Sequence, residues 1–281
     1  MLRTGGVRRR RVVELTAFDP QTGRWTTVEP GGHVDCAEFT VSTYNIWFED
    51  HFATERFRAI ADVLSAQRPD VMVFQEVTRD ALEVFLSQPW IRAEYTCAAV
   101  VDGSVGNYGM LMLSRLPVSH VAYARLPSRT GRGWLQAELA VTGRTTDICS
   151  VHLDSGRKSS WRRAWQLRTL FRALRKVENA VVLGDFNMRD DENKRIPAAW
   201  CDAWPALRPG EPGFTEDTSI NAMRFDMKNK PRHVRFDRVL VKGPDWAPAE
   251  IDLLGTAPLS PDNPRVFPSD HFGVRCRLEK R

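Results

Sequence analysis

Polar side chains that could act in acid–base or metal chemistry stand where five apolar segments of the chain begin or end. In chain order they are Asn45 in TYNI, Glu76 in QEV, His152 and Ser155 in HLDS, Asp185 and Asn187 in GDFN, and Asp270 and His271 in SDH. Side chains at strand ends can meet at one edge of a fold. That edge is in contact with solvent, whereas the interior is not. We therefore expect these residues to converge on one site.

The residue types suit the attack of water on a phosphodiester. Such a site must neutralise an anion, orient the water and steady the leaving oxygen. Mg²⁺ prefers oxygen ligands and keeps several of its waters, so one or two carboxylates suffice to hold it. Glu76 is the best ligand candidate, with Asn45 beside it and Asp270 near it or one water away. Mg²⁺ is the predicted cofactor, and Mn²⁺ is an expected substitute.

Five further residues have predicted roles in the reaction. Asp185 can accept a proton from the attacking water, and the amide of Asn187 can hold that water in line. His271 can donate to a phosphate oxygen as negative charge builds up. His152 and Ser155 are expected to hold the other phosphate oxygens.

Each motif alone also has an ordinary structural explanation. Asn45 could form a buried turn, and Glu76 could cap a helix or pair with an arginine. GDFN could be a turn that closes a strand, His152 could be a core imidazole, and SDH could be a polar loop. All five explanations would have to hold at five strand ends in this order, which is less convincing than one shared site.

The ordered motifs resemble those of the endonuclease/exonuclease/phosphatase superfamily of magnesium-dependent phosphodiesterases. The resemblance runs from about residue 37 to residue 279 and is specific as a set. PSRTGRGWLQ, GDFNMRD, RFDRVL, IDLLG and FPSDHFG resemble one branch in particular, that of tyrosyl-DNA phosphodiesterase 2. The resemblance implies hydrolysis of phosphotyrosyl or related adducts at a 5′ end of nucleic acid.

The resemblance also assigns residues that the motifs alone do not. Asp237 in RFDR is implied to lie behind His271 and fix its tautomer. Tyr108 matches a family position near the site, although a core aromatic would fit equally well. The branch typically has Tyr-Thr-Trp where this chain has Phe214, Thr215 and Glu216. Phe214 could therefore stack on a nucleotide or belong to the core, and Glu216 predicts altered recognition of the strand end.

Composition fits a globular protein that binds an acidic partner. Of 281 residues 42% are hydrophobic and 27% are charged, and the net charge is +5. This is typical of a folded chain rather than a disordered one, and arginine suits phosphate partners. No apolar run approaches the roughly 18 residues that a membrane span needs. The five cysteines are scattered and form no C-x-x-C pair, which favours reduced thiols in the cytoplasm.

The spacing of apolar residues predicts many strands and three helices. The helices are expected at 54–67, 81–88 and 159–177, the last with Trp161 and Trp165 on its apolar stripe and Arg162 and Arg163 on a basic face. A loop-rich stretch is expected from about 188 to 232. The pattern predicts an α/β fold, namely a four-layer sandwich of two face-packed, mainly antiparallel sheets flanked by helices.

Two units are predicted along the chain. Residues 1–35 are a basic N-terminal extension with a β-hairpin at 12–29, and residues 1–11 of it are expected to be mobile. Residues 36–281 are the catalytic domain. The partner is expected to be a DNA or RNA end and not a membrane, and the chain a monomer that could belong to a larger complex through residues 1–35.

Three functions remain open from the sequence. The first is hydrolysis of 5′-phosphotyrosyl adducts, and the second is another phosphodiesterase activity on the same fold: RNA-end processing, deadenylation, abasic-site incision or phosphoinositide hydrolysis. The last of these is disfavoured because no membrane-binding basic amphipathic segment accompanies the core. The third is a nucleic-acid-binding module without activity, which the complete set of acid, amide and histidine residues disfavours.

Overall fold

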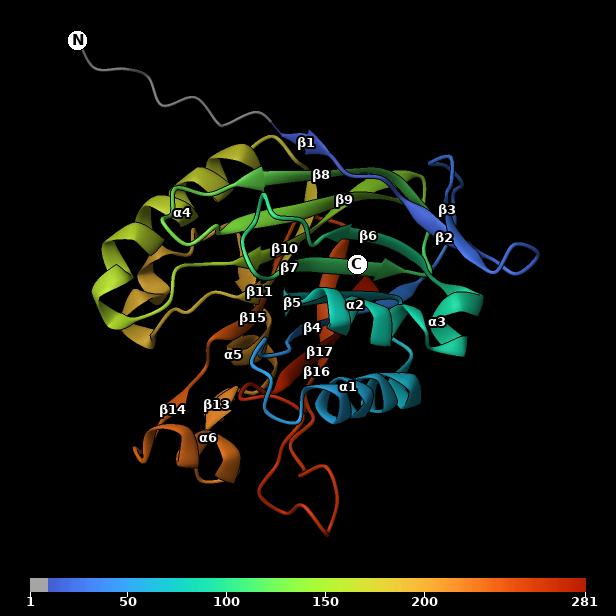
Figure 1. Ribbon diagram of the computed structural model, residues 1–281. Coiled ribbons are helices and arrows are strands. Elements are labelled where there is room, and N and C mark those ends of the chain that lie inside the picture. The colour runs from blue at the N-terminus through green and yellow to red at the C-terminus, as the bar shows by residue number, and fades with distance from the viewer. Residues whose placement is uncertain (1–9) are drawn as a thin grey trace.

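The computed structural model describes residues 10–281, and two β-sheets packed face to face form its centre (Figure 1). One sheet has eight strands. In spatial order they are β16 (Trp246–Leu254), β17 (Gly273–Lys280), β4 (Glu38–Asn45), β5 (Val71–Val77), β7 (Gly109–Ser114), β6 (Thr96–Val100), β2 (Thr16–Asp19) and β3 (Arg24–Thr27). The strands β4 and β5 run parallel, and the other neighbours run antiparallel.

The second sheet has seven strands. In spatial order they are β1 (Arg11–Val12), β8 (Val118–Arg125), β9 (Gly133–Val141), β10 (Arg144–His152), β11 (Asn179–Asp185), β15 (Asp237–Lys242) and β12 (Cys201–Asp202). Its parallel pair is β10 and β11, in which His152 lies opposite Asp185. Each sheet thus contains one parallel pair whose strands end at residues of the predicted site.

The main core fills the space between the sheets. Val41, Val73 and Met112 of the eight-stranded sheet belong to one buried cluster with Leu135 and Val181 of the seven-stranded sheet. Branched aliphatic side chains are favoured there because they pack well on a pleated surface. This core fixes how the ends of β4 and β5 face the ends of β10 and β11.

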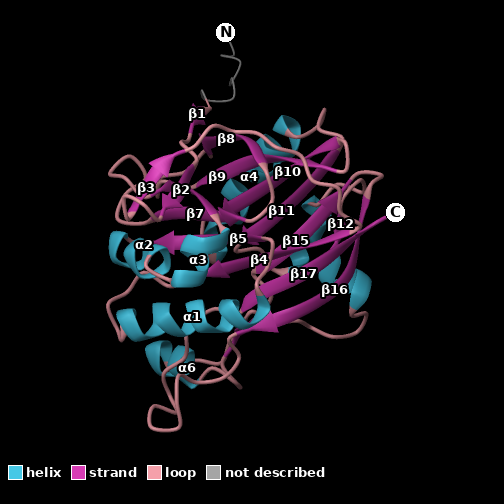
Figure 2. Cartoon of the chain, turned by 90° about the vertical axis from the view of Figure 1, so that its right-hand side faces the viewer, coloured by secondary structure: helices cyan, strands magenta, loops and turns pink. Residues whose placement is uncertain are grey.

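Helices cover the two outer faces (Figures 1 and 2). On the eight-stranded sheet lie α1 (Ala53–Gln67), α2 (Arg79–Leu86) and α3 (Pro89–Glu94), which bury Phe57, Phe85 and Ile91 in a second cluster. On the seven-stranded sheet lies α4 (Ser160–Ala173), which buries Leu167 and Leu170. The predicted four-layer α/β sandwich is therefore confirmed.

The buried face of α4 differs from the predicted one. Trp161 and Trp165 are 63% and 54% exposed, whereas Arg163 is 1% exposed. Arg163 can be buried because its guanidinium binds Glu192 and donates to the carbonyl oxygens of Asp154 and Gly156. The prediction that both tryptophans face the core and that Arg163 lies on a solvated basic face was wrong.

The C-terminal half contains elements that the sequence did not predict. Between 188 and 232 lie two helices, α5 (Ala203–Leu207) and α6 (Ala222–Lys228), the 3₁₀ turn η2 (Asp190–Arg195), and β13 (Glu216–Asp217), which pairs with β14 (His233–Val234). A second 3₁₀ turn, η1 (Arg157–Ser159), precedes α4. The nine-residue β16 was also missed, because a bulge between Pro248 and Glu250 breaks its alternation.

The described part of the N-terminal segment joins both sheets. The predicted hairpin is present as β2 and β3, and β2 pairs with β6 at the edge of the eight-stranded sheet. Arg11 and Val12 form β1 and pair with β8 of the other sheet. The division of the chain at residue 35 stays a prediction. The expected mobility of residues 1–11 falls mainly on residues 1–9, outside the described residues.

All five cysteines are free, and Cys97, Cys149 and Cys276 are buried. Among residues 10–281, none of the helices combines the length and the apolar character needed to cross a bilayer.

Candidate active site

Most of the predicted site residues meet in one cleft of about 660 Å³ at the ends of the two parallel strand pairs. Asn45 and Glu76 come from the ends of β4 and β5, and His152 and Asp185 from the ends of β10 and β11. Also lining the cleft are Tyr108, Ser155, Asn187, Asp270 and His271. Asp237, at the start of β15, lies buried behind His271.

Asp185 is surrounded by hydrogen-bond donors. Its Oδ1 accepts from the backbone of Asn187 at 2.8 Å, and its Oδ2 accepts from the amides of Asn187 at 2.7 Å and Asn45 at 3.1 Å. Burial alone would raise the pKa of Asp185, but the nearby Nε2 of His152, 3.3 Å away, and the charge of His271 outweigh burial and lower it. Asp185 is therefore ionised and held in one orientation.

The backbone that presents Asp185 needs a glycine before it. Gly184 has φ +139°, and a Cβ there would lie 2.1 Å from the carbonyl oxygen of Val151 on the neighbouring strand β10. An alanine would have to push the two parallel strands apart. The glycine of the GDFN motif thus allows the close approach of β10 and β11 that brings His152 to Asp185.

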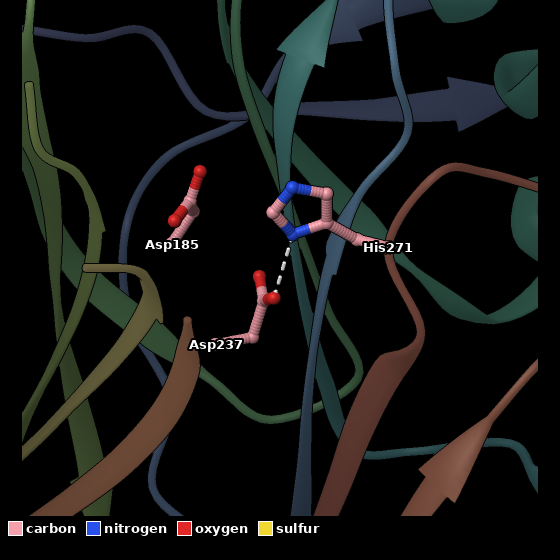
Figure 3. A group of neighbouring side chains, drawn as sticks. All are labelled: Asp185, Asp237 and His271. Atoms are coloured by element: carbon pink, nitrogen blue, oxygen red, sulfur yellow. Dashed lines mark hydrogen bonds and ion pairs between the residues drawn. The ribbon is translucent and has the colours of Figure 1, made fainter. Parts of the chain in front are cut away.

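His271 is paired with the buried carboxylate of Asp237. Nδ1 of His271 lies 2.8 Å from Oδ2 of Asp237, and Asp185 lies beside the imidazole (Figure 3). Burial lowers the pKa of His271, but the charges of Asp237 and Asp270 more than offset it, so the pKa is raised well above 6.5. His271 is thus an imidazolium at neutral pH, with Nδ1 occupied by Asp237.

His152, unlike His271, is neutral. Its Nδ1 lies 2.7 Å from Nη1 of Arg132, and because arginine can only donate, Nδ1 is the acceptor. Burial and the charge of Arg132 lower the pKa of His152 to about 4. The neutral ring therefore carries its proton on Nε2, which lies 3.3 Å from Oδ2 of Asp185. His152 lines the cleft, and its Nε2 makes no hydrogen bond within residues 10–281. That His152 holds a phosphate oxygen therefore stays a prediction.

Glu76 and Asp270 are the carboxylates that border the open part of the cleft. Glu76 sits at a bulge at the end of β5 with φ +63°, and its Oε2 accepts from the backbone of Phe48 at 3.4 Å. Burial, and after it the charge of Asp270, raises the pKa of Glu76 to about 7. Two acids that oppose each other's ionisation in a partly dry cleft are a donor set that a divalent cation would neutralise. These residues fit a metal ion.

Asn45 of the predicted ligand set is already hydrogen-bonded within the protein. It donates to Asp185 and accepts from the backbone of Trp47 at 3.1 Å, and its role as a metal ligand stays a prediction. Ligand atoms of Asp185, Asp237 and His271 lie within 4.8 Å of one another and could in principle hold a metal (Figure 3). Asp237 and His271 already bind each other there, which favours a hydrogen-bonded group over a metal site.

The three predicted substrate contacts have different surroundings. Ser155 is exposed and lines the cleft. Tyr108 also lines the cleft, with its ring stacked on His152 at 6.1 Å and under the guanidinium of Arg132 at 5.7 Å. Phe214 is not among the residues that line the cleft, and its ring packs against His233 at 5.6 Å. The prediction that Phe214 contacts substrate is therefore not supported.

Several residues that support the site were missed in the sequence. Arg56 on α1 is fully buried and donates to the carbonyl oxygens of Ile46, Trp47 and Pro268, which ties the loop after Asn45 to the loop before Asp270. The Thr215 hydroxyl accepts from the backbone of Asp237 at 3.1 Å. Arg132, which binds His152, stood in the quoted segment PSRTGRGWLQ but was not singled out.

Glu216 does not face substrate in the way the sequence suggested. It is 1% exposed, and its carboxylate binds the guanidinium groups of Arg224 and Arg232. Together with the two arginines the carboxylate carries a net positive charge, so the altered recognition of the strand end, which stays a prediction, would not come from repulsion of phosphate. The signal was available as two arginines 8 and 16 residues further on, but only the fold brings them together.

Comparison with known proteins agrees with the site. The model of the Endonuclease/Exonuclease/phosphatase family matches residues 42–271. Tyrosyl-DNA phosphodiesterase 2 of Xenopus laevis is 29% identical over 262 residues, which cover 87% of this chain and 67% of the relative. The protein of the same name from Homo sapiens is 28% identical over 287 residues, which cover 95% of this chain and 76% of the relative.

Solved structures show the same fold. The crystal structure of D. rerio TDP2 complexed with single strand DNA product has a TM-score of 0.76 at 23% identity, covering 87% of this chain and all of the other. The human Nocturnin catalytic domain with bound sulfate anion has a TM-score of 0.63 at 18% identity, covering 87% of this chain and 95% of the other.

The fold and the site together define a hydrolase of phosphoric ester bonds. Two face-packed sheets carry, at their rim, an ionised Asp185, a charged His271 and a pair of carboxylates that fit a metal. The chain belongs to the endonuclease/exonuclease/phosphatase family. The family is metal-dependent, and the resemblance drawn from the sequence motifs is confirmed.

Proposed function

We propose that the chain hydrolyses the phosphodiester bond between a tyrosine side chain and a 5′ end of DNA. The observation that carries the proposal is the arrangement of Asp185 and the Asp237–His271 pair on one side of the cleft, with Glu76 and Asp270 as a second group of acids. The similarity to tyrosyl-DNA phosphodiesterases over 87% of the chain supports the choice of substrate.

The charge states of the side chains suggest how they share the work. Asp185 is ionised and can accept a hydrogen bond from the attacking water, while Asn187 and His152 keep its carboxylate in place. His271 is positively charged and can donate from Nε2 to an oxygen of the phosphate as charge builds up. Arg132 adds a further positive charge beside Asp185.

The bond changes are simple. The water oxygen forms a bond to phosphorus, the bond from phosphorus to the tyrosine oxygen breaks, and the water proton passes to Asp185. The leaving group is a phenol with an ordinary pKa near 10, so it needs less help from an acid than an alkoxide would. We propose Mg²⁺ as the ion, held by Glu76 and Asp270, where it would neutralise charge on the phosphate.

The Asp185 group sets this proposal apart from simple nucleic-acid binding. A binding module needs positive charge, whereas this site directs three hydrogen-bond donors at one buried carboxylate and keeps it ionised. A buried charge is costly unless it is fully paired.

We infer that the chain acts as a monomer in a reducing compartment, which size-exclusion chromatography and fractionation would test.

A substrate panel tests the proposal. The purified chain is given a 5′-tyrosyl single-stranded oligonucleotide, an abasic duplex, poly(A) and a 3′-blocked RNA, each with Mg²⁺. We expect the highest kcat/KM on the tyrosyl substrate, with a 5′-phosphorylated oligonucleotide as product. Faster turnover of any of the other three substrates would show that the tyrosyl oligonucleotide is not the preferred substrate. Asp185→Asn is the control for a contaminating nuclease.

A further inference from the structure

Glu216 organises two arginines on one wall of the cleft. It lies in β13 and is almost fully buried, and its two oxygens bind different guanidinium groups. Oε1 accepts from Nε of Arg224, and Oε2 accepts from Nε of Arg232 at 2.7 Å. Glu216 and both arginines line the cleft. One buried carboxylate therefore fixes the direction of two positively charged groups.

Arg232 keeps part of its guanidinium available. Its Nε and Nη2 both face Glu216 at 2.7 Å, and no acceptor among residues 10–281 binds its Nη1. The side chain is 29% exposed, compared with 10% for Arg224. An arginine has five N–H donors in a rigid fork. The outer edge of Arg232 is thus pre-oriented toward the cleft without a partner of its own.

The position of Arg232 relative to the reacting groups is set by Phe236. The ring of Phe236 stacks on His271 with a centroid distance of 5.9 Å. The guanidinium of Arg232 lies 5.8 Å from the same ring, and that of Arg189 lies 6.0 Å from it. Both arginines therefore border the His271 side of the cleft.

The rest of this wall is also positively charged. Lys228 and Lys230, at the end of α6 and just beyond it, line the cleft with Arg189, Arg224 and Arg232. Arg224 faces inward, since its Nε lies 3.7 Å from Oδ2 of Asp270 as well as beside Glu216. Arg224 thus offsets the two acids, and Arg232 is left to meet a ligand.

We propose that Arg232, aimed by Glu216 and assisted by Arg189, binds a second phosphate of the substrate strand, the one adjacent to the phosphate that is hydrolysed. This rests on the proposed function for the identity of the strand. Guanidinium groups match phosphate oxygens in pairs, whereas the aromatic ring on this wall, Phe236, is flanked by two guanidiniums and stacked on His271. The chain then recognises the strand end by its backbone.

Two substrates that differ in a single charge test the subsite. Both are 5′-tyrosyl oligonucleotides, and in one the first internucleotide linkage is an uncharged methylphosphonate. We expect the wild type to prefer the charged substrate about tenfold in kcat/KM, chiefly through KM, as befits one charged hydrogen-bonded contact. Arg232→Ala should lower kcat/KM about tenfold on the charged substrate and leave the methylphosphonate substrate within twofold of wild type.

Further variants separate binding from structure. Arg265→Ala is the matched control, because Arg265 is exposed and paired with Asp226 at 2.8 Å and does not line the cleft. It should leave both substrates unaffected. Arg232→Lys keeps the charge but loses the fork and should fall between wild type and alanine. Glu216→Gln, which retains both arginines but not their anchor, should reduce the preference for the charged linkage.

The outcomes that overturn the subsite are distinct from failure of the proposed function. Equal losses on both substrates for Arg232→Ala would show a structural role, and no loss on either would show that the strand does not reach Arg232. If neither tyrosyl substrate is cleaved by wild type, the proposed function fails. Calorimetric titration with the 5′-phosphorylated dinucleotide, carrying either linkage, still decides the subsite: Arg232→Ala should weaken binding of the charged dinucleotide alone.

Discussion

The carboxylate of Asp237 lies 2.8 Å from Nδ1 of His271, and neither residue is more than 8% exposed. His152, across Asp185 from this pair, instead receives a hydrogen bond from Arg132 on its Nδ1. His271 thus has a carboxylate behind it and is charged, whereas His152 has a guanidinium behind it and is neutral. Their partners, not the histidines, decide which can stabilise negative charge and which can hold Asp185.

Asp237→Asn should lower kcat by about 10² with little change in KM, because the charge of His271 is used mainly in the transition state. A histidine whose pKa is raised stays protonated below that pKa, so activity is lost as pH rises through it. Asp237 is the largest cause that raises the pKa. The alkaline limb of the pH–rate profile should therefore move to lower pH in the variant.

The pH–rate profiles of wild type and Asp237→Asn, measured with saturating substrate, check this relationship. His271→Ala serves as the control, because it should lose the alkaline limb altogether along with most of the rate. An alkaline limb at the same pH in wild type and Asp237→Asn would mean that another group sets it.

Asp185→Asn should abolish most turnover and leave binding of a single-stranded oligonucleotide nearly unchanged. The amide keeps the shape of the side chain but removes the charge to which three hydrogen-bond donors point. Loss of a positioned base commonly costs ~10² to 10⁴ in rate. Activity and fluorescence anisotropy measured side by side check this, and a variant that keeps more than about a tenth of the rate would refute the role, since that is under ~1.4 kcal/mol.

Removal of divalent ions should abolish activity, and Mg²⁺ or Mn²⁺ should restore it. In the metal-free protein burial raises the pKa of Glu76 to about 7, so an ion must displace a proton at lower pH. The Mg²⁺ concentration for half-maximal rate should therefore fall as pH rises from 6 to 8. Glu76→Gln should need more Mg²⁺ and show a weaker dependence on pH. Full turnover in EDTA would contradict the metal requirement.

The sequence predicted the sandwich well because the strands that form it are strongly apolar. Its errors lie where charged residues are buried with partners distant in sequence. Arg163 lies on the inner face of α4 because Glu192, 29 residues away, neutralises it. Helical spacing cannot show such a pair, so Trp161 and Trp165 were assigned to the core instead.

The site residues also divide into those that the sequence predicted and those that it did not. Residues that end strands, such as Asp185 and Glu76, were found because a polar residue after an apolar run stands out. Arg132 and Arg56 escaped because the chain has many arginines and their role depends on which carbonyl or ring they meet. Asn45 was found, but its amide proved to be committed to Asp185 and Trp47, which sequence spacing does not reveal.

Glu216→Trp should lower activity and stability rather than improve binding of a strand end. The indole would remove the carboxylate that binds Arg224, which is 10% exposed, and leave it with the more distant carboxylate of Asp270 at 3.7 Å. Removing one partner of a buried ion pair typically costs about 3–5 kcal/mol of stability. Thermal unfolding and kcat/KM on a 5′-tyrosyl strand check this, with Arg265→Ala as control. A gain on that substrate with an unchanged Tm would show that position 216 tolerates an aromatic side chain that contacts the nucleic acid.

Hydrolysis of a 5′-tyrosyl single-stranded oligonucleotide in ¹⁸O-labelled water tests most directly whether water attacks the phosphorus of the tyrosyl linkage. We expect free tyrosine without label and a 5′-phosphate that contains one ¹⁸O atom, formed by wild type with Mg²⁺ and nearly absent with Asp185→Asn. Label in the tyrosine oxygen, or cleavage at internal linkages while the tyrosyl bond stays intact, would contradict it.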